Sequence, residues 1–171
     1  MIIEENIRWF QQQLLNWSQD NLRNYPWRGT KDPYKILVAE FLLQRTDADT
    51  VKPIYETFLT RYPSLDELAN ADIKNLSELL QPLGLFFRAS RLLQTTWIIK
   101  DRYEGKVPQS EKELLKLPEV GKYTARAILS QAFDRPAAVL DTNVVRIIER
   151  FFGITGGRVK SRCKILTERS R

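Results

Sequence analysis

Apolar side chains recur every three or four positions along most of this chain, a spacing that places them on one face of an α-helix. The first stripe consists of Ile3, Ile7, Phe10, Leu14 and Trp17. Very few segments alternate apolar and polar residues in the way that a half-buried β-strand does. The pattern predicts an all-α fold that begins with a helix over this first stripe.

Capping residues and prolines divide the rest of the chain into short helices. Ser64 with Glu67, and Ser110 with Glu113, have the spacing of capping boxes at helix N-termini. The longer predicted helices cover residues 33–45, 47–62, 72–80, 86–102, 122–133 and 143–152. We expect these helices to pack together through short loops.

The stretch "LPEVGKYTARAI", residues 117–128, joins two of these helices through a tight turn at residues 118–121. A helix-hairpin-helix of this kind leaves the first N–H groups of the second helix unpaired at the positive end of the helix dipole. A phosphate is a natural ligand there, and such a contact carries no base information. An ordinary helical hairpin has the same pattern, so this stretch by itself does not assign a function.

The composition excludes several kinds of site. The 171 residues contain no histidine and one cysteine, Cys163. One cysteine cannot form an internal disulfide, and alone it cannot hold a structural zinc ion or an iron–sulfur cluster. Residues 156–171 contribute +5 of the net charge of +6, so this basic tail is either a solvated terminus or a segment that binds a polyanion.

The chain is also expected to be intracellular. It has no apolar run of about 18 residues, the length of a membrane-spanning helix. Its amino terminus, "MIIEENIRWFQQQ", has acids and glutamines where a signal peptide has basic residues and then an apolar core. We therefore expect no contact with a membrane.

Four blocks of sequence carry a resemblance to a known family. They are "YPWRGTKDPYKILVAEFLLQRT" (25–46), "LGLFFRASRL" (83–92), "LPEVGKYTARAILSQAF" (117–133) and "AVLDTNVVRIIERFFGI" (138–154). In content and order they resemble the helix-hairpin-helix (HhH-GPD) base-excision DNA glycosylases of the endonuclease III/MutY superfamily. Within it, the MutY-type adenine glycosylases and the Mig-type thymine/guanine mismatch glycosylases are most similar.

The resemblance implies two helical lobes around a DNA cleft. Residues 1–24 would form a helix of the second lobe. Residues 25–134 would form a six-helix, barrel-like domain with the helix-hairpin-helix at 110–133. Residues 135–171 would return to the second lobe with the catalytic aspartate, a helix and the basic tail.

Three residues match catalytic positions of the family. Asp141 takes the place of its essential aspartate, which stabilises the oxocarbenium-like state as the glycosidic bond breaks, although alone it would fit an ordinary helix cap. Glu40 resembles the MutY glutamate that protonates the departing adenine, and a solvent-facing glutamate is the alternative. Tyr123 stands where bifunctional members have a lysine, and a phenol cannot form a Schiff base.

The resemblance also implies a DNA-binding surface. Gln44 and Arg45 match the helix end that fills the gap left by an extruded base and reads the opposite base. The other expected DNA contacts are Phe86 and Phe87 beside the lesion, Arg88 at a phosphate, and Val120, Gly121, Lys122 and Thr124 in the hairpin. Aromatic residues at helical spacing are more often core, and arginines often snorkel along the surface, so these alternatives stay open.

Three features depart from the family pattern. Glu119 replaces the usual first glycine of the hairpin turn and brings a negative charge to the expected phosphate site. The four-cysteine iron–sulfur loop is missing, so no cofactor or metal is predicted. The MutY domain that recognises 8-oxoguanine is also missing, and the second lobe looks incomplete, as expected for a truncated gene, a trimmed chain or a divergent cluster-free member.

The sequence therefore predicts a monomeric, cytoplasmic, nucleoid-associated DNA glycosylase that acts on double-stranded DNA with a mismatched or damaged base. The base would be adenine opposite guanine or 8-oxoguanine, or thymine or uracil opposite guanine. Tyr123 predicts hydrolysis to an abasic site without lysine-dependent strand cleavage. A non-catalytic DNA-binding remnant is the competing hypothesis, and an interaction protein that uses its basic tail is a third.

Overall fold

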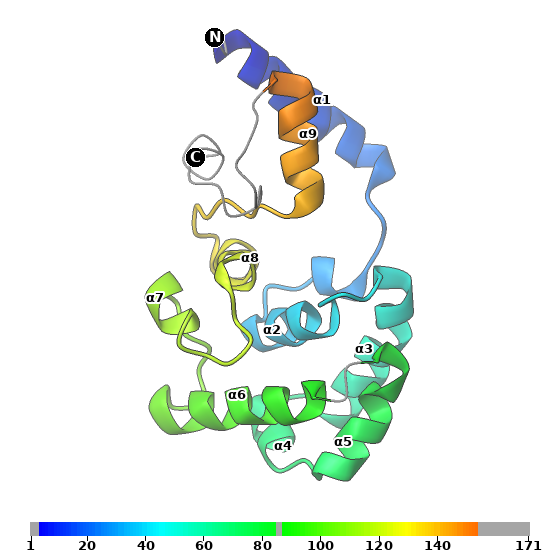
Figure 1. The fold of residues 1–171 in the computed structure, drawn as a ribbon, viewed down its shortest axis with the longest axis vertical. Helices are drawn as coiled ribbons and strands as arrows, with labels where there is room; N and C mark the ends of the chain where they lie inside the picture. Colours follow the sequence, from blue (N-terminus) through cyan, green and yellow to red (C-terminus); the bar gives the residue numbers. More distant parts are fainter. Residues whose placement is uncertain (1–3, 85–86, 154–171) are drawn as a thin grey trace.

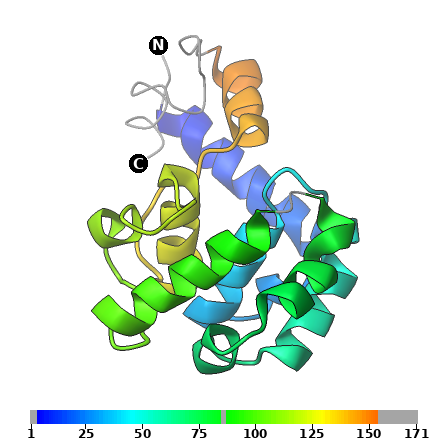
Figure 2. The same ribbon diagram turned by 60° about the horizontal axis from the view of Figure 1, so that its bottom comes forward.

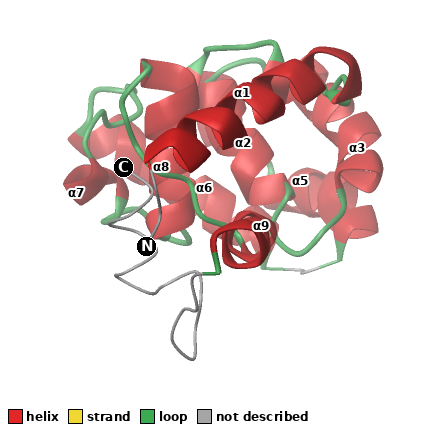
Figure 3. Ribbon diagram, turned by 90° about the horizontal axis from the view of Figure 1, so that it is seen from above, coloured by secondary structure: helices red, strands yellow, loops and turns green. Residues whose placement is uncertain are grey.

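Every described residue of the computed structural model lies in a helix, a turn or a loop, as Figure 3 shows for residues 4–84 and 87–153. The all-α prediction is confirmed for this part of the chain. The elements are α1 (Glu4–Asn21), η1 (Pro26–Arg28), α2 (Pro33–Leu42), α3 (Ala48–Arg61), α4 (Leu65–Ala69), α5 (Ile73–Leu80), η2 (Gln81–Leu83), α6 (Arg88–Arg102), α7 (Glu111–Leu114), α8 (Lys122–Phe133) and α9 (Thr142–Phe152). The predicted contact of Phe86 and the basic tail lie outside the described residues.

Side-chain caps set the starts of several helices where the sequence predicts them. The Asp72 carboxylate accepts a hydrogen bond from the backbone N–H of Asn75 at 2.9 Å, and Ser110 accepts one from Glu113 at 3.2 Å. Such bonds satisfy donors that the first helical turn leaves free. Two predicted boundaries are wrong by a few residues, because α2 ends at Leu42 rather than near residue 45 and α6 begins at Arg88.

Helix α2 forms the centre of the core. Eight of its ten residues are buried, and it packs against α3, α6 and α8. A helix that is apolar on nearly all sides is stable only when neighbouring elements surround it. This central position explains why α2 can bring its C-terminal residues to a fixed place beside α8 (Figure 1).

Helices α1 and α9 come from distant parts of the chain and lie together at one end of the molecule (Figure 1). The Trp9 and Phe151 rings stack at 5.8 Å between centroids, and Phe10 meets Phe152 edge to face at 5.2 Å. No residue of α1 is buried, and Val145 is the buried residue of α9. The first helix is thus confirmed, but its apolar stripe is only partly covered within the described residues.

The other end of the molecule consists of α4, α5 and α6 (Figures 1 and 2). Helix α6 packs against both α4 and α5. The expected division of the chain at residues 24 and 134 stays a prediction. Among residues 4–84 and 87–153, no helix has both the length and the apolar character that crossing a bilayer requires.

Candidate active site

A cleft of about 600 Å³ lies where the C-terminal end of α2 meets the first turns of α8 and α9. Six residues predicted from the sequence line this cleft, namely Glu40, Gln44, Arg45, Tyr123, Thr124 and Asp141. They come from three separate segments of the chain. Packing of α2 against α8 brings the first two segments together, and the loop after α8 carries Asp141 back to the same cleft.

Glu40 is a buried carboxyl group at this cleft, with 7% of its surface exposed. Burial disfavours the charged form, which raises the pKa of Glu40 to about 7, while a hydrogen bond from the Gln131 side chain acts in the opposite direction. The alternative of a solvent-facing glutamate does not fit this burial. A carboxyl group with such a pKa is partly protonated near neutral pH, so it has a proton to donate.

Tyr123 stands in the first turn of α8 with 43% of its surface exposed. Partial desolvation of its hydroxyl, followed by the charges of Glu40 and Asp141, raises the pKa of Tyr123 to about 12. The phenol is therefore neutral at physiological pH. Because both carboxyl groups act on this hydroxyl, the three predicted catalytic residues share one electrostatic environment.

Asp141 serves as the N-cap of α9 and also lines the cleft. Its Oδ1 accepts a hydrogen bond from the backbone N–H of Val144 at 2.6 Å, and its Oδ2 accepts one from Asn143 at 3.3 Å. The capping bond fixes the carboxylate in place. The two interpretations of this aspartate, helix cap and site residue, are thus compatible.

The segment Gln44–Thr46 follows α2 and forms one wall of the cleft. The Gln44 amide donates a hydrogen bond to the backbone carbonyl of Glu119 at 3.2 Å. Arg45 is exposed and has a left-handed backbone with φ of 56°, a conformation that costs free energy for any residue with a Cβ atom. Strained residues of this kind cluster at functional sites, where surrounding contacts hold them.

Arg88 is the predicted site residue whose role the structure corrects. Only 2% of its surface is exposed, so its guanidinium is not available to a DNA phosphate. It donates to the backbone carbonyls of Leu42 and Gln44 and to the Thr46 hydroxyl. Burial also lowers its pKa. The sequence did not reveal the inward position of Arg88, because its hydrogen-bond partners are more than forty positions away in the chain. Leu42, for example, is 46 positions from Arg88.

The helix-hairpin-helix has the predicted form, with α7 and α8 joined by a turn. Gly121 is the N-cap of α8 and supplies no side-chain hydrogen bond, so the first turn of α8 keeps its donors for another acceptor. Lys122 is exposed there, while Val120 and Thr124 are buried. The Val120 N–H already donates to the Leu117 carbonyl at 3.3 Å.

Glu119 occupies the turn with a left-handed backbone, at φ of 59°. Its carboxylate lies 3.7 Å from the Arg91 guanidinium, and this pair is partly exposed. Glycine adopts such a backbone without steric cost, whereas glutamate does not. The side chain of Glu119 therefore imposes both strain and negative charge beside the candidate phosphate site.

The sequence profile of the HhH-GPD superfamily, described as base excision DNA repair proteins, matches residues 38–169. The chain belongs to the HhH-GPD superfamily. This confirms the resemblance to the endonuclease III and MutY proteins, and the match includes both the helix-hairpin-helix and the Asp141 segment.

Individual HhH-GPD proteins are similar to this chain over most of its length. A thymine/uracil-DNA glycosylase from Methanothermobacter thermautotrophicus is 40% identical over 80% of this chain and 62% of its own length. An adenine DNA glycosylase from Buchnera aphidicola subsp. Baizongia pistaciae is 37% identical over 85% of this chain and 42% of its own length. The chain therefore spans less than two thirds of these curated relatives.

A solved HhH-GPD structure has the same fold. The structure of a thermostable thymine-DNA glycosylase matches with a TM-score of 0.91 and 35% identity, covering 97% of this chain and 77% of that chain. In its described residues, the chain therefore has the two-lobed, all-helical architecture that the sequence predicts.

The iron–sulfur cluster that the resemblance associates with the HhH-GPD family does not fit the residues of this chain. A cluster of that kind needs four thiolates, and the 171 residues contain one cysteine. Within the described residues, no group of three or more His, Cys, Asp or Glu side chains is arranged to hold a metal ion. The proposed reaction uses neither an iron–sulfur cluster nor a metal ion.

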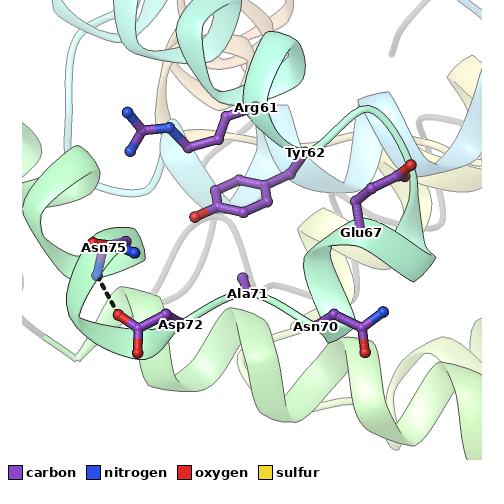
Figure 4. A pocket seen from close by; sticks show the side chains of 7 residues that line it. All are labelled: Arg61, Tyr62, Glu67, Asn70, Ala71, Asp72 and Asn75. Carbon is purple, nitrogen blue, oxygen red and sulfur yellow. Dashed lines mark hydrogen bonds between the residues drawn. The ribbon is translucent and has the colours of Figure 1, made fainter.

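A second hollow of about 610 Å³ lies between α3, α4 and α5, away from the carboxyl groups of Glu40 and Asp141 (Figure 4). Its acidic side chains hold helix ends: Asp72 caps α5 through Asn75, and Glu67 is bonded to Ser64 in the capping box of α4. These bonds already account for the carboxylates there. The cleft with Glu40 and Asp141 is therefore the better candidate for catalysis.

Two residues were not predicted from the sequence: Thr46, which lines the cleft, and Gln131, which bonds the lining residue Glu40. Gln131 reaches Glu40 from the last turns of α8, and Thr46 lies between Arg88 and the cleft. Eight positions along a helix turn the Gln131 side chain about 80° from that of Tyr123, so the helical spacing held no clear signal for this contact. Phe87 is half exposed, in agreement with a surface role.

Proposed function

We propose that this chain is a monofunctional DNA glycosylase that hydrolyses the N-glycosidic bond of a mismatched base and leaves an abasic site. The observation that supports this most strongly is the meeting of Glu40, Tyr123 and Asp141 at one cleft. The names of its relatives point in the same direction. Its partner would be double-stranded DNA, which it would bind as a monomer in the cytoplasm.

Asp141 would stabilise the positive charge that develops on the sugar as the base departs. An anionic carboxylate favours an oxocarbenium-like transition state, and it can also help to activate water. Two hydrogen-bond donors, the Val144 N–H and the Asn143 amide, hold this carboxylate in place. A fixed charge needs little reorganisation during the reaction.

Glu40 would supply a proton to the departing base or orient the attacking water. Its pKa of about 7 allows it to carry that proton at neutral pH. A carboxylic acid and a carboxylate at the same site are the usual pair for glycoside hydrolysis. The different environments of Glu40 and Asp141 assign the acid role to the buried group.

Tyr123 makes hydrolysis, rather than an imine pathway, the expected chemistry. Its neutral phenol cannot attack the sugar to form a Schiff base. Lys122 is the neighbouring amine, and one position along a helix turns a side chain about 100° away. Lys122 would therefore contact the DNA backbone instead of the sugar that reacts.

The base must leave the helical stack before it can reach this cleft. Extrusion costs roughly a few kcal/mol and is least costly at a mismatch. Gln44 and Arg45, on the wall of the cleft, would fill the vacated space and contact the opposite base. The first turn of α8 would hold a phosphate nearby.

Thymine or uracil opposite guanine is our first substrate candidate, and adenine opposite guanine or 8-oxoguanine is the second. The thymine-type structure with a TM-score of 0.91 and the relative with 40% identity support this order. The adenine-type relative with 37% identity keeps the second candidate in place. In both kinds of substrate the N-glycosidic bond would be hydrolysed.

A non-catalytic DNA-binding remnant is the competing proposal, and one observation favours it. Helix α1 has no buried residue within the described structure, and Trp9, Leu15 and Trp17 are each more than half exposed. An incompletely covered lobe would hold α9 and its Asp141 loosely. Such a protein would bind DNA through the hairpin without releasing a base.

Single-turnover base release separates these two proposals. Duplexes carrying T·G, U·G, A·G and A·8-oxoG would be incubated with excess protein, and abasic sites would be revealed by alkali. Release that is lost in Asp141→Asn establishes a glycosylase and identifies its substrate. Binding without release from any duplex would instead establish the remnant.

Borohydride trapping tests the monofunctional assignment. The wild-type chain should give no covalent DNA adduct, because it has no amine at residue 123. Tyr123→Lys serves as the positive control, since it places an amine in the same turn. A strong adduct with the wild-type protein would overturn the assignment and indicate that Lys122 reacts.

A further inference from the structure

The C-terminal end of α2 is bound by a side chain from a distant helix. The Arg88 Nη1 donates to the Leu42 carbonyl at 2.9 Å, and its Nη2 donates to the Thr46 hydroxyl at 2.8 Å and to the Gln44 carbonyl. The last carbonyls of a helix have no intrahelical donors, and they attract cations. Arg88 thus supplies from α6 the partners that the end of α2 lacks.

Thr46 completes this connection. Its hydroxyl accepts the hydrogen bond from Arg88 and lies 3.4 Å from both the Gln44 and the Leu83 carbonyls. The guanidinium and the hydroxyl therefore both bind the Gln44 carbonyl, which belongs to the peptide group just before Arg45. The left-handed conformation of Arg45 is held from inside the protein, while its side chain remains exposed at the cleft.

Stability alone does not account for this arrangement. Arg88 has 2% of its surface exposed, and its Nε has no hydrogen-bond partner among the described residues. A buried cation with an unpaired donor is unfavourable compared with a well-packed apolar side chain. Two of the three atoms that Arg88 binds belong to the Gln44–Thr46 segment at the wall of the cleft, and the third is the last carbonyl of α2.

We propose that Arg88 is a positioning residue whose buried guanidinium, together with Thr46, holds the Gln44–Thr46 segment in the conformation that presents Gln44 and Arg45 to DNA. This inference rests on the proposed role of those two residues at a mismatch. Arg88 would then act on DNA recognition through this segment instead of contacting a phosphate itself. The segment is then ordered before DNA binds, which lowers the entropy lost in recognition.

Thr46→Val provides the main test, because it removes one of the three acceptors of Arg88 and keeps nearly the same side-chain shape. The measurement is the ratio of dissociation constants for fully paired and T·G duplexes, with the full chain. Loss of one charge-assisted hydrogen bond is expected to reduce this ratio about tenfold. Thr46→Ser, which keeps the hydroxyl, should recover most of the loss.

Thr96→Val is a matched control for this test. Thr96 is buried, whereas Thr46 is partly exposed, and the Thr96 hydroxyl donates to the Leu92 carbonyl within α6, away from the cleft. The same chemical change there should leave the ratio unaltered. Equal reductions in Thr46→Val and Thr96→Val would overturn the inference, because they would indicate a general effect of lower stability.

A double variant tests whether Thr46→Val changes DNA discrimination through the Gln44 side chain. In the Gln44→Ala background, adding Thr46→Val should reduce the ratio by much less than tenfold, since interacting residues are not additive. The same reduction in both backgrounds would contradict the inference, as would a wild-type chain that binds both duplexes equally. Wild-type discrimination without base release would refute the proposed glycosylase activity and leave this test intact.

Discussion

The Gln44 side-chain amide donates a hydrogen bond to the Glu119 carbonyl at 3.2 Å and so joins the end of α2 to the turn of the helix-hairpin-helix. Seventy-five positions separate the two residues in the chain. One belongs to the segment proposed to fill the DNA gap, and the other to the turn proposed to hold a phosphate. Their contact joins these two elements, both of which are proposed to bind DNA.

Replacing Glu119 by glycine should strengthen DNA binding. The Glu119→Gly change keeps the carbonyl that Gln44 binds, removes a negative charge near the phosphate, and relieves a left-handed backbone at φ of 59°. We expect a severalfold lower dissociation constant at low salt, and about 1 kcal/mol more stability from the backbone. Fluorescence anisotropy and thermal melting measure the two effects.

Glu104→Gly is the matched control for this substitution. Glu104 also has a left-handed backbone, at φ of 53°, and it is not among the residues that line the cleft. It should gain a similar amount of stability with no change in DNA affinity. If both glycine variants bound DNA with equal strength, the charge of Glu119 would have no role in binding.

Asp141→Asn should abolish base release while the protein stays folded. Asparagine is as good an N-cap as aspartate, so the cap of α9 is retained and the melting temperature should change little. Loss of the carboxylate charge should slow the chemical step at least about 100-fold. Asp72→Asn, which alters the cap of α5 in the same way, should release base at the wild-type rate.

Glu40 should make the free energy of unfolding depend on pH. Its pKa rises from 4.5 to about 7 on folding, so the unfolded chain ionises first as the pH increases. Because of Glu40, the free energy of unfolding should decrease between about pH 4.5 and 7. Above that range it should be about 3 kcal/mol lower than below about pH 4.5. Comparing urea unfolding of wild type and Glu40→Gln isolates this contribution.

The Glu40→Gln variant should lack this decrease, because glutamine does not titrate. Parallel pH curves for the two proteins would show that Glu40 has an ordinary pKa in the folded chain. Other carboxyl groups titrate in both proteins, so their effects cancel in the difference.

Gln131→Leu should shift the pH dependence of base release. The hydrogen bond from Gln131 lowers the pKa of Glu40 and so acts against burial. Without it the carboxyl group stays protonated to higher pH, and the alkaline limb of the single-turnover rate should move upward in pH. An unchanged limb would mean that Gln131 does not act on the group that titrates.

Local sequence signals predicted much of the helical framework. The capping residues Ser64, Asp72 and Ser110 act through bonds to residues three positions away, so their effect is readable from a short window. The helix-hairpin-helix was predictable for the same reason. Its phosphate-binding role was inferred from the unpaired N–H groups at the start of its second helix, and the catalytic role of Asp141 from the family resemblance; both stay proposals to be tested.

By itself, the sequence determined the helices, their caps and the residue types available for catalysis, because those depend on neighbours within a few positions. Only the tertiary structure decided that Glu40 is buried, that Arg88 points inward to the end of α2, and that α1 leaves its aromatic side chains largely exposed. Each of these outcomes depends on which distant elements pack against the residue. Burial and charge pairing are properties of that packing, and they set the pKa values and contacts on which the proposed chemistry rests.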